Sequence, residues 1–445
     1  MKKYIYKASV LALFAGVLFT SCEPEVDYDV NPSAGAELDF SNYVAVGNSL
    51  TAGYQDGGLY REAQLNSYPA ILADQFEEVG GGEFVQPLFS EAERNGSGYL
   101  RLAGLPTPTS PVLEPVTTEL AVRRDVQPLP GGPRLTKFTD PVNNLAVPGI
   151  SVLSAATPVY GGVNPYFERL LTDAEVGQKS YLQKVAETQP TFFTMWLGNN
   201  DVLTYATNGA VADPTNPFSD KTPVATFRAV YTQMLAALTK GGEVEGVVAN
   251  IPDVTAVPFF TTVNLNSIRQ SESVPDDAVI YIKVGPAPTD VRPLTMDDLV
   301  LLTTKDKVGR PDQVQTPAGP VAIPHGFHPA NPLTDSEVLD QAEVAEIKEH
   351  VRQLNEVIAQ VADANNIAVF DVNAFFNNIK GGFNIDEVTY SPAFISGNLF
   401  SLDGIHLTPR GYAIIANEFI RVINSYYKAS VPTVDVTNYR TVVFP

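Results

Sequence analysis

The feature that most constrains the fold is a series of short apolar runs that end in polar, glycine-containing turns and alternate with helix-like segments. The first run is Tyr43–Val46, and Gly47, Asn48 and Ser49 follow it. Continuous apolar runs of this length are typical of strands covered on both faces. Strands that alternate with helices predict βαβ units, and therefore an α/β fold with a parallel sheet.

The same reasoning places the other elements. We expect strands over 143–151, 191–197, 245–251 and 367–372, and helices over 70–76, 181–187, 223–238 and 335–363, with a last helix from 409. Ser67 and Thr408 suit helix N-caps, and a proline follows each closely. In the 335–363 segment, apolar residues recur at spacings of three and four, which predicts one core-facing stripe. These residues are Ile347, Val351, Leu354, Ile358 and Val361.

Two long segments interrupt this pattern. Residues 80–140 are rich in glycine and proline and have no strong periodicity, which indicates a long insertion of the kind that often borders a functional site. Residues 259–335 form a second insertion, to which we assign no chemistry. The main domain then spans 38–428 and the C-terminal tail 429–445, in which residues 430–445 are expected to form an edge strand.

The N-terminus has the features of an export signal. Basic residues precede the apolar segment Ala8–Phe19, which is too short to span a bilayer comfortably. The segment that ends in Ser21 and Cys22 resembles the lipobox of bacterial lipoproteins, in which Cys22 would become the lipid anchor after removal of residues 1–21. An ordinary signal peptide is the alternative.

Residues 22–37 are acidic and predict a flexible tether. An acidic run just after the lipid cysteine resembles the surface-export signal of Bacteroidetes-type lipoproteins, whereas a plain solvated linker is the alternative. The resemblance implies an exported protein that is lipid-anchored in the bacterial outer membrane, facing either the periplasm or the outside.

The charge and cysteine content restrict the possible functions. The formal net charge is −21, which argues against binding nucleic acid through its phosphates. Cys22 is the single cysteine, so the chain forms no internal disulfide. The sequence contains no phosphate-binding P-loop motif, and it implies no redox or nucleotide cofactor and no required metal.

Ser49 needs a base if it is to act as a nucleophile, because a serine hydroxyl is a weak nucleophile at neutral pH. His406 is the best candidate, since Asp403 lies three residues earlier and can orient the imidazole from within a tight turn. The other histidines are weaker candidates. His350 is expected on a solvated helix surface, and His325 and His328 are expected in an exposed loop.

Acyl transfer also needs hydrogen-bond donors directed at the oxyanion that develops in the transition state. Asn200 follows a predicted strand and offers a side-chain N–H. Gly149 offers a backbone N–H that no side chain obstructs, and the amide of Ser49 would be the third donor.

Taken together, these segments resemble the SGNH/GDSL family of serine ester hydrolases. The family's four sequence blocks occur here in the family's order, each after a predicted strand or before the last helix. They are Gly47-Asn48-Ser49-Leu50, the glycine of Ala146-Val147-Pro148-Gly149, Gly198-Asn199-Asn200-Asp201, and Asp403-Gly404-Ile405-His406.

The resemblance implies a three-layer α/β/α sandwich with a parallel, roughly five-stranded sheet that carries large loop insertions. It also implies site roles: Ser49 as nucleophile, His406 as general base and acid, Asp403 as orienting carboxylate, and Ser49, Gly149 and Asn200 as the oxyanion hole. Asn48 departs from the family's aspartate. Because Asp403 supplies the triad carboxylate, we expect Asn48 to affect only local hydrogen bonds.

Three functions remain open from the sequence. The first is an extracytoplasmic ester hydrolase of lipase or esterase type, which would meet ester substrates and contact the membrane through its N-terminal lipid. The second is a carbohydrate O-acetyl esterase of the same fold. The third is a catalytically silent surface lipoprotein that binds a glycan or another partner, a hypothesis motivated by the large insertions.

Overall fold

The computed structural model describes residues 31–36, 38–107, 110–270, 274, 277–317, 319–385 and 387–445. The expected signal peptide over 1–21, the anchor Cys22 and most of the expected tether over 22–37 lie outside these residues. Among the described residues, no helix is both long enough and apolar enough to span a membrane.

The central sheet is parallel. It contains β1 (Tyr43–Gly47), β4 (Phe192–Trp196), β5 (Glu245–Ala249) and β12 (Ala368–Phe370), in the order β1-β4-β5-β12. Residues 143–147 add a rudimentary fifth strand beside β1, since the backbone N–H groups of Leu145 and Val147 donate to Ala45 and Gly47. The predicted α/β fold with a parallel sheet of about five strands is therefore confirmed.

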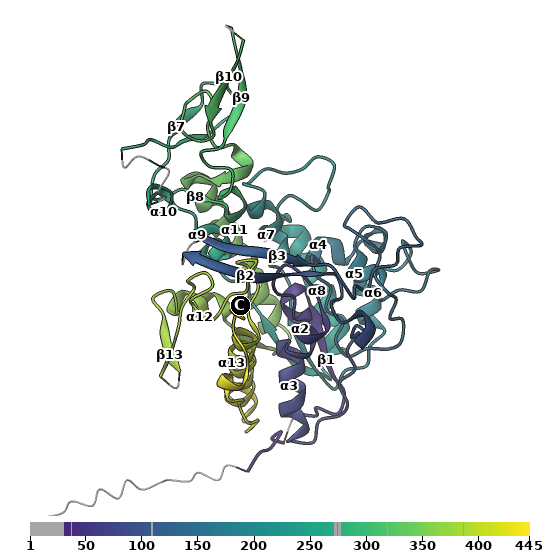
Figure 1. Cartoon of the computed structure of the whole chain (residues 1–445). Coiled ribbons are helices and arrows are strands. Elements are labelled where there is room, and N and C mark those ends of the chain that lie inside the picture. The colour runs from purple at the N-terminus through teal and green to yellow at the C-terminus, as the bar shows by residue number, and fades with distance from the viewer. Residues whose placement is uncertain are drawn as a thin grey trace, which may run out of the picture. The chain divides into compact units, whose positions relative to one another are not determined.

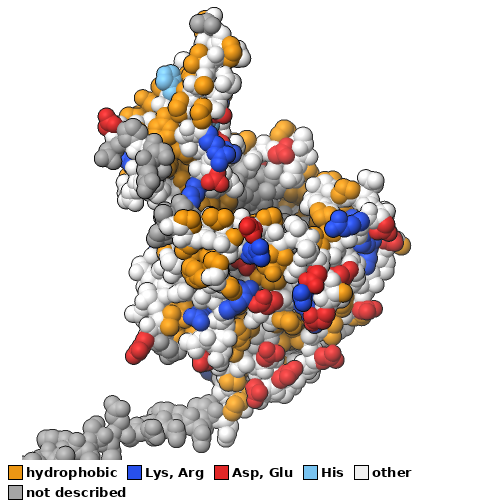
Figure 2. All heavy atoms as spheres, viewed as in Figure 1, with side chains coloured by type: hydrophobic (Ala, Val, Ile, Leu, Met, Phe, Trp, Pro, Cys, Tyr) orange, Lys and Arg blue, Asp and Glu red, His pale blue; other side chains and the backbone are white. Residues whose placement is uncertain are grey.

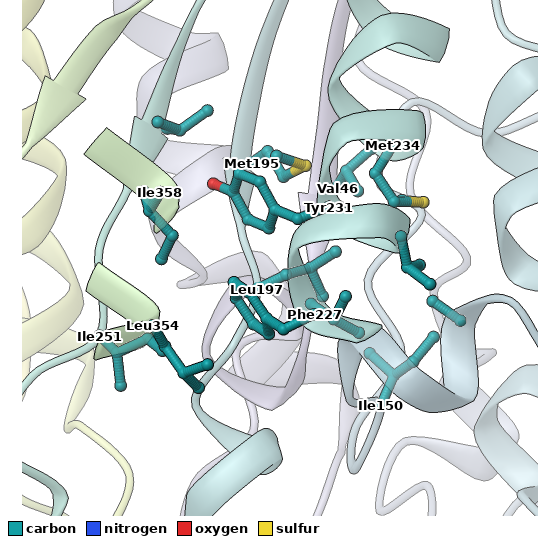
Figure 3. Packing of buried hydrophobic residues seen from close by; sticks show 14 of the residues in the cluster. Val46, Ile150, Met195, Leu197, Phe227, Tyr231, Met234, Ile251, Leu354 and Ile358 are labelled. Atoms are coloured by element: carbon teal, nitrogen blue, oxygen red, sulfur yellow. The ribbon is translucent and has the colours of Figure 1, made fainter. Parts of the chain in front are cut away.

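One helical layer covers the first face of the sheet. It contains α4 (Val152–Ala155), α5 (Pro165–Glu168), α6 (Tyr181–Ala186), α7 (Asn200–Thr207), α8 (Val224–Thr239) and α11 (Gln341–Asp363). The predicted stripe on α11 is buried, as expected. Figure 3 shows Met195 of β4 packed among Tyr231 and Met234 of α8 and Ile358 of α11. Fully burying one large apolar side chain contributes about 1.5–3 kcal/mol.

The opposite face is covered by α3 (Tyr68–Glu77) and α13 (Pro409–Tyr427), which pack against each other (Figure 1). Both caps work as predicted. The Ser67 side chain accepts a hydrogen bond from Ala70 N–H, and that of Thr408 accepts one from Gly411 N–H. Alternate strand residues face the two layers, as Val44 and Tyr43 of β1 do. The result is a three-layer α/β/α sandwich.

The remaining helices and strands lie in the segments that connect the elements of the sandwich. The helices are α1 (Ser49–Ala52), α2 (Arg61–Leu65), α9 (Pro258–Thr261), α10 (Leu265–Arg269) and α12 (Val372–Asn378). The two-stranded sheets are β2 (Tyr99–Thr107) with β3 (Ser110–Val116), β6 (Tyr281–Lys283) with β7 (Val291–Pro293), β8 (Leu299–Val300) with β11 (Val338–Leu339), β9 (Pro311–Thr316) with β10 (Gly319–Pro324), and β13 (Phe383–Ile385) with β14 (Val388–Tyr390). Short 3-10 helices are η1 (Glu91–Glu93), η2 (Pro158–Gly162), η3 (Val254–Ala256), η4 (Leu302–Thr304), η5 (Asp335–Glu337) and η6 (Val436–Asn438).

The first insertion, predicted over 80–140, is fixed to the main domain by charge. Glu168 of α5 has a fully buried side chain, and Arg123, Arg134 and Lys137 of the insertion each lie 2.8 Å from its carboxylate. A buried carboxylate is tolerated only when cations and hydrogen bonds replace its water. On the face shown in Figure 2, acidic and basic side chains are likewise interspersed.

The second insertion, predicted over 259–335, has a small apolar core of its own. Val263, Ile268, Ile280, Ile282, Leu294, Val300, Leu333 and Val338 are all buried in one cluster. Leu302 packs against this cluster and also against the main core, so it joins the two. Ion pairs to Glu168 thus join the first insertion to the main domain, together with a buried apolar cluster that contains Phe89, Ala121 and Leu135, and the second insertion has a separate apolar cluster.

The edge strand expected over 430–445 is wrong. Ser430 makes a single bridge with Ser33, and the segment then runs along α13. Two asparagines of α13 explain this path, because each pairs with both backbone groups of one tail residue. Asn424 bonds to Val431, and Asn417 bonds to Val434, at 2.8–2.9 Å. These side chains satisfy the backbone groups that a neighbouring strand would otherwise satisfy.

Candidate active site

Ser49 lies just beyond the carboxyl end of β1 and is the first residue of the short helix α1. The side chain of Asn48 caps this helix by accepting a hydrogen bond from Leu50 N–H at 3.0 Å. An aspartate would accept the same bond, so this departure from the family's block preserves the local geometry. The carboxyl edge of a parallel sheet is where α/β proteins bind their ligands.

Three side chains that are far apart in the sequence meet at this edge. Ser49 Oγ lies 2.8 Å from His406 Nε2, and His406 Nδ1 lies 2.8 Å from Asp403 Oδ2. The carboxylate accepts a hydrogen bond from Nδ1–H, so Nε2 is left to accept a hydrogen bond from the hydroxyl of Ser49. This geometry is that of a nucleophile, a base and an orienting acid.

The environment of Asp403 keeps it ionised. Burial alone would raise its pKa, but the charge of His406 and the hydrogen bonds from His406 and Ile405 hold the pKa well below its usual range. The two side chains are only 12% and 13% exposed, so water screens their attraction weakly. The carboxylate is therefore charged throughout the physiological pH range.

Asn200 lies beside this site, at the start of α7 after β4. One N–H of its side-chain amide donates to the carbonyl oxygen of Ile150 at 2.9 Å, which leaves its second N–H for a ligand. The neighbouring Asp201 is fully buried and accepts from the backbone N–H of Val152 at 2.8 Å. Residues 200 and 201 thus bind the loop that follows Gly149.

Gly149 follows residues 143–147, which pair with β1, and it therefore lies at the same sheet edge as Ser49. Its φ of +82° is in the left-handed region that favours glycine. Within the described part of the chain, the backbone N–H groups of Ser49 and Gly149 donate to no other residue. Both are thus free to donate to a bound oxygen atom.

A mostly apolar cleft opens at Ser49 and runs across the ends of β4 and β5 toward α12. Ser49, Asn200 and His406 line the cleft at the end of β1, and Asp253 and Lys380 line the part of the cleft near α12. Its apolar lining consists of Leu50, Trp196, Leu203, Pro252, Val254, Ala256, Val257, Phe376, Ile379, Pro392, Leu399, Phe400, Ile405 and Leu407. Gly149 lies outside this lining.

The other histidines lie away from the site, and two sequence expectations about them are wrong. His350 is half-buried rather than solvated, because its Nε2 lies 2.9 Å from the carbonyl oxygen of Thr222. His325 is buried between Glu337 and Asp312, at 2.8 Å and 3.1 Å from their carboxylates. Among the described residues, no group of three or more His, Cys, Asp or Glu side chains could hold a metal ion.

The sequence analysis missed three contributors to the site. Asp201 stood in a recognised block, but its bond to Val152 depends on the fold. Asp56 and Gly57 contact the turn that carries Asp403, and the Asp-Gly pair was a recognisable turn signal. The cleft residues of α12 had no signal, since Phe376 and Ile379 are ordinary apolar residues in a short helix.

The family model described as GDSL-like Lipase/Acylhydrolase matches residues 43–419. No curated protein matches the chain.

Similar solved structures include a lipase/acylhydrolase from Enterococcus faecalis, with 12% identity, a TM-score of 0.33, and 88% of this chain and 98% of that chain covered. Another is a mutant acetyl-xylooligosaccharide esterase from Geobacillus Stearmophilus, with 11% identity, a TM-score of 0.35, and 87% and 95% covered. An extracellular lipase from Streptomyces rimosus has 14% identity, a TM-score of 0.32, and 86% and 98% covered. The match to the family model spans most of the chain, and the chain accordingly belongs to the GDSL-like lipase/acylhydrolase family of ester hydrolases.

Proposed function

We propose that the protein is a serine ester hydrolase in which Ser49, His406 and Asp403 act as a catalytic triad. The observation that carries this proposal is the continuous pair of 2.8 Å hydrogen bonds from Ser49 Oγ through the imidazole to Asp403. A catalytically silent binding protein would have no need for this alignment, which requires residues 357 positions apart to meet.

The proposed reaction proceeds through an acyl-enzyme. Ser49 Oγ attacks the ester carbonyl carbon while its proton moves to His406 Nε2. The carbonyl oxygen becomes an oxyanion, which the backbone N–H groups of Ser49 and Gly149 and the free N–H of Asn200 would stabilise. The C–O bond to the alcohol then breaks, and His406 returns the proton to the leaving oxygen. His406 then deprotonates a water molecule, whose oxygen attacks the acyl carbon. The bond from that carbon to Ser49 Oγ breaks, the acid leaves, and His406 returns the proton to Ser49 Oγ.

We further propose that the acyl chain occupies the apolar cleft. Consecutive strands lie about 4.8 Å apart, so a cleft from the end of β1 to the region of β12 spans about 14 Å. A single acetyl group would leave most of this apolar lining unused, whereas a butyryl to octanoyl chain would cover it. The cleft thus favours an ester with a butyryl to octanoyl chain over the acetyl ester of a carbohydrate.

A chain-length series tests this function on the purified protein. We expect p-nitrophenyl butyrate or octanoate to be hydrolysed faster than the acetate, and Ser49→Ala to lose at least about 10⁴-fold in kcat. In Phe376→Ala and Ile379→Ala, the octanoate-to-acetate ratio of kcat/KM should fall about tenfold because apolar contacts are lost. Asn378→Ala, a surface change on the last residue of α12, is the matched control.

Three outcomes would contradict the proposed function. Full turnover by Ser49→Ala would exclude the triad. Activity confined to acetylated xylo-oligosaccharides would instead support the carbohydrate esterase. Failure of the wild-type protein to react with a fluorophosphonate would favour a silent binding protein.

We also propose that the protein is exported and anchored in the outer membrane by a lipid on Cys22. The motif over residues 18–22 and the acidic segment after it support this proposal. Protease treatment of whole cells should degrade a surface-facing form and leave a periplasmic form intact.

A further inference from the structure

A tight turn after α1 lies against the segment that carries the triad carboxylate. Gln55 and Gly58 exchange two backbone hydrogen bonds of 3.0 Å and 2.9 Å around Asp56 and Gly57. Both central residues are left-handed, with φ values of +54° and +74°. Asp-Gly is a favoured sequence for such a turn, but the conformation is uncommon for a residue other than glycine. Left-handed residues held in place by their surroundings occur often at functional sites.

The turn delivers donors to Asp403. Gly57 N–H donates to Asp403 Oδ2 at 3.0 Å, and this is the same oxygen that accepts from His406 Nδ1. The N–H of Asp56 donates to Ser401 Oγ at 2.9 Å, and the Ser401 hydroxyl donates to Asp403 Oδ1 at 3.2 Å. One donor therefore comes directly from the turn, and a second comes through a serine that the turn orients.

Asp56 also holds the segment that leads to Asp403. Its side chain accepts from the backbone N–H of Leu402 at 3.0 Å and from the Tyr60 hydroxyl at 2.9 Å. The residue is 7% exposed, so these bonds replace its contact with water. Together, Asp56 and Gly57 contact three consecutive residues, 401, 402 and 403.

A cation from the C-terminal segment reaches this network. Arg440 donates to the Tyr60 hydroxyl at 3.0 Å and pairs with Glu62. Arg410, in the first turn of α13, holds the segment in place by donating to the carbonyl oxygens of Tyr439 and Arg440 at 2.8 Å and 3.0 Å. The charge of Arg440 is thus fixed near Asp56 by contacts with the main domain.

The charges around Asp56 oppose one another. Burial raises the pKa of Asp56, and the nearby charge of Asp403 adds to this effect, whereas the bonds from Leu402 and Tyr60 and the charge of Arg440 act in the opposite direction. Tyr412 of α13 and Tyr99 of β2 are further titratable groups that interact with Asp56. The charges of Asp56, Asp403, Glu62 and Arg440 therefore all contribute to the electrostatic field near the imidazole.

We propose that Asp56 is a positioning residue for Asp403, and that Arg440 balances its charge through Tyr60. The inference rests on the proposed triad, but it concerns how this chain holds the triad's acid. The structural basis is the set of bonds from the 55–58 turn to residues 401–403, and the link from that turn to the C-terminal segment.

Two variants with opposite charge changes test the proposal. Asp56→Asn keeps the size of the side chain but loses one acceptor and one negative charge. We expect kcat to fall roughly 10- to 100-fold, with KM changed less than about threefold, because a displaced catalytic group loses rate more than binding. Arg440→Met should cause a smaller loss of kcat.

The pH profile separates electrostatics from simple damage to the fold. The acid limb of kcat/KM reports the base of the free enzyme, here His406. Losing the negative charge of Asp56 disfavours the imidazolium, so the limb should move to lower pH in Asp56→Asn. Losing the positive charge of Arg440 favours the imidazolium, so the limb should move to higher pH in Arg440→Met. Asp363→Asn, which removes an exposed charge at the end of α11, should leave the acid limb where it is in the wild type.

Shifts in the same direction, or no shift in either folded variant, would overturn the inference. If Asp56→Asn does not fold, Arg440→Met still tests the proposal through the expected shift of its acid limb to higher pH. Turnover by Ser49→Ala would show that the proposed function has failed. Ser49-dependent turnover with unmoved profiles would overturn the positioning role alone.

Discussion

Asp403, which is 13% exposed, and Asp201, which is fully buried, are both carboxylates that hold a loop of the site, yet their surroundings differ. Asp403 accepts backbone and hydroxyl hydrogen bonds and also faces the imidazole of His406. Asp201 accepts hydrogen bonds from neutral donors, which include the backbone N–H groups of Val152 and Leu153 and the side chain of Thr222. Burial raises the pKa of Asp201 to about 6, against the opposing effect of those bonds, whereas the pKa of Asp403 is lowered.

The difference indicates that hydrogen bonds from neutral donors do not fully offset the effect of burial on the pKa of Asp201. Removing a carboxylate from water favours its neutral form, and a nearby cation reverses that preference. Asp403 has such a partner whenever His406 is protonated, which is the state that the proposed reaction creates. Asp201 has a structural task, holding the loop after Gly149, and that task does not require a permanent charge.

The largest expected effect comes from breaking the pair that Asp403 forms with His406. Asp403→Asn keeps the shape of the side chain but no longer fixes the Nδ1–H tautomer of His406. We expect kcat for an ester substrate to fall about 10³- to 10⁴-fold while the protein remains folded. Steady-state kinetics with circular dichroism would measure both, and a loss of less than tenfold would contradict the role given to Asp403.

An intermediate effect is expected on the side of the site that Asp201 supports. Asn200→Ala removes one donor for the oxyanion and the bond to Ile150. Removing one such donor typically lowers kcat about 10²- to 10³-fold. Fluorophosphonate labelling of Ser49 should still occur, although more slowly. An unchanged kcat would mean that the oxyanion is bound by Ser49 and Gly149 alone.

The smallest effect concerns stability rather than rate. Because the folded pKa of Asp201 is raised to about 6, the folded state binds its proton more tightly than the unfolded state does. Its contribution to stability is therefore present near pH 4 and is lost as pH rises through 6, by on the order of 2 kcal/mol.

Urea denaturation of the wild type and Asp201→Asn at pH values between 4 and 7 would measure this contribution. The free energy of unfolding of the wild type should fall relative to that of the variant as pH rises. A constant difference across that range would show that Asp201 does not titrate there.

Much of the fold could be predicted because local patterns and the parallel sheet agree. Apolar runs matched β1, β4, β5 and β12, and the stripe on α11 faced the core as its spacing indicated. The edge strand over 430–445 could not be predicted correctly, because two asparagines on α13 bind the tail and no pattern within the tail reports this. His325 and His350 were misjudged for the same reason, since their burial comes from distant segments.

The sequence by itself determined which residues could do the chemistry. Ser49, Asn200, Asp403 and His406 stand in ordered blocks, each next to a recognisable strand or helix end, and short-range geometry explains why those blocks have their form. Only the tertiary structure decided what surrounds them. The cleft toward α12, the support of Asp403 by Asp56, and the reach of Arg440 join segments up to several hundred residues apart. Such contacts arise when the strands and helices pack together, and no periodicity or motif spacing in the sequence indicates them.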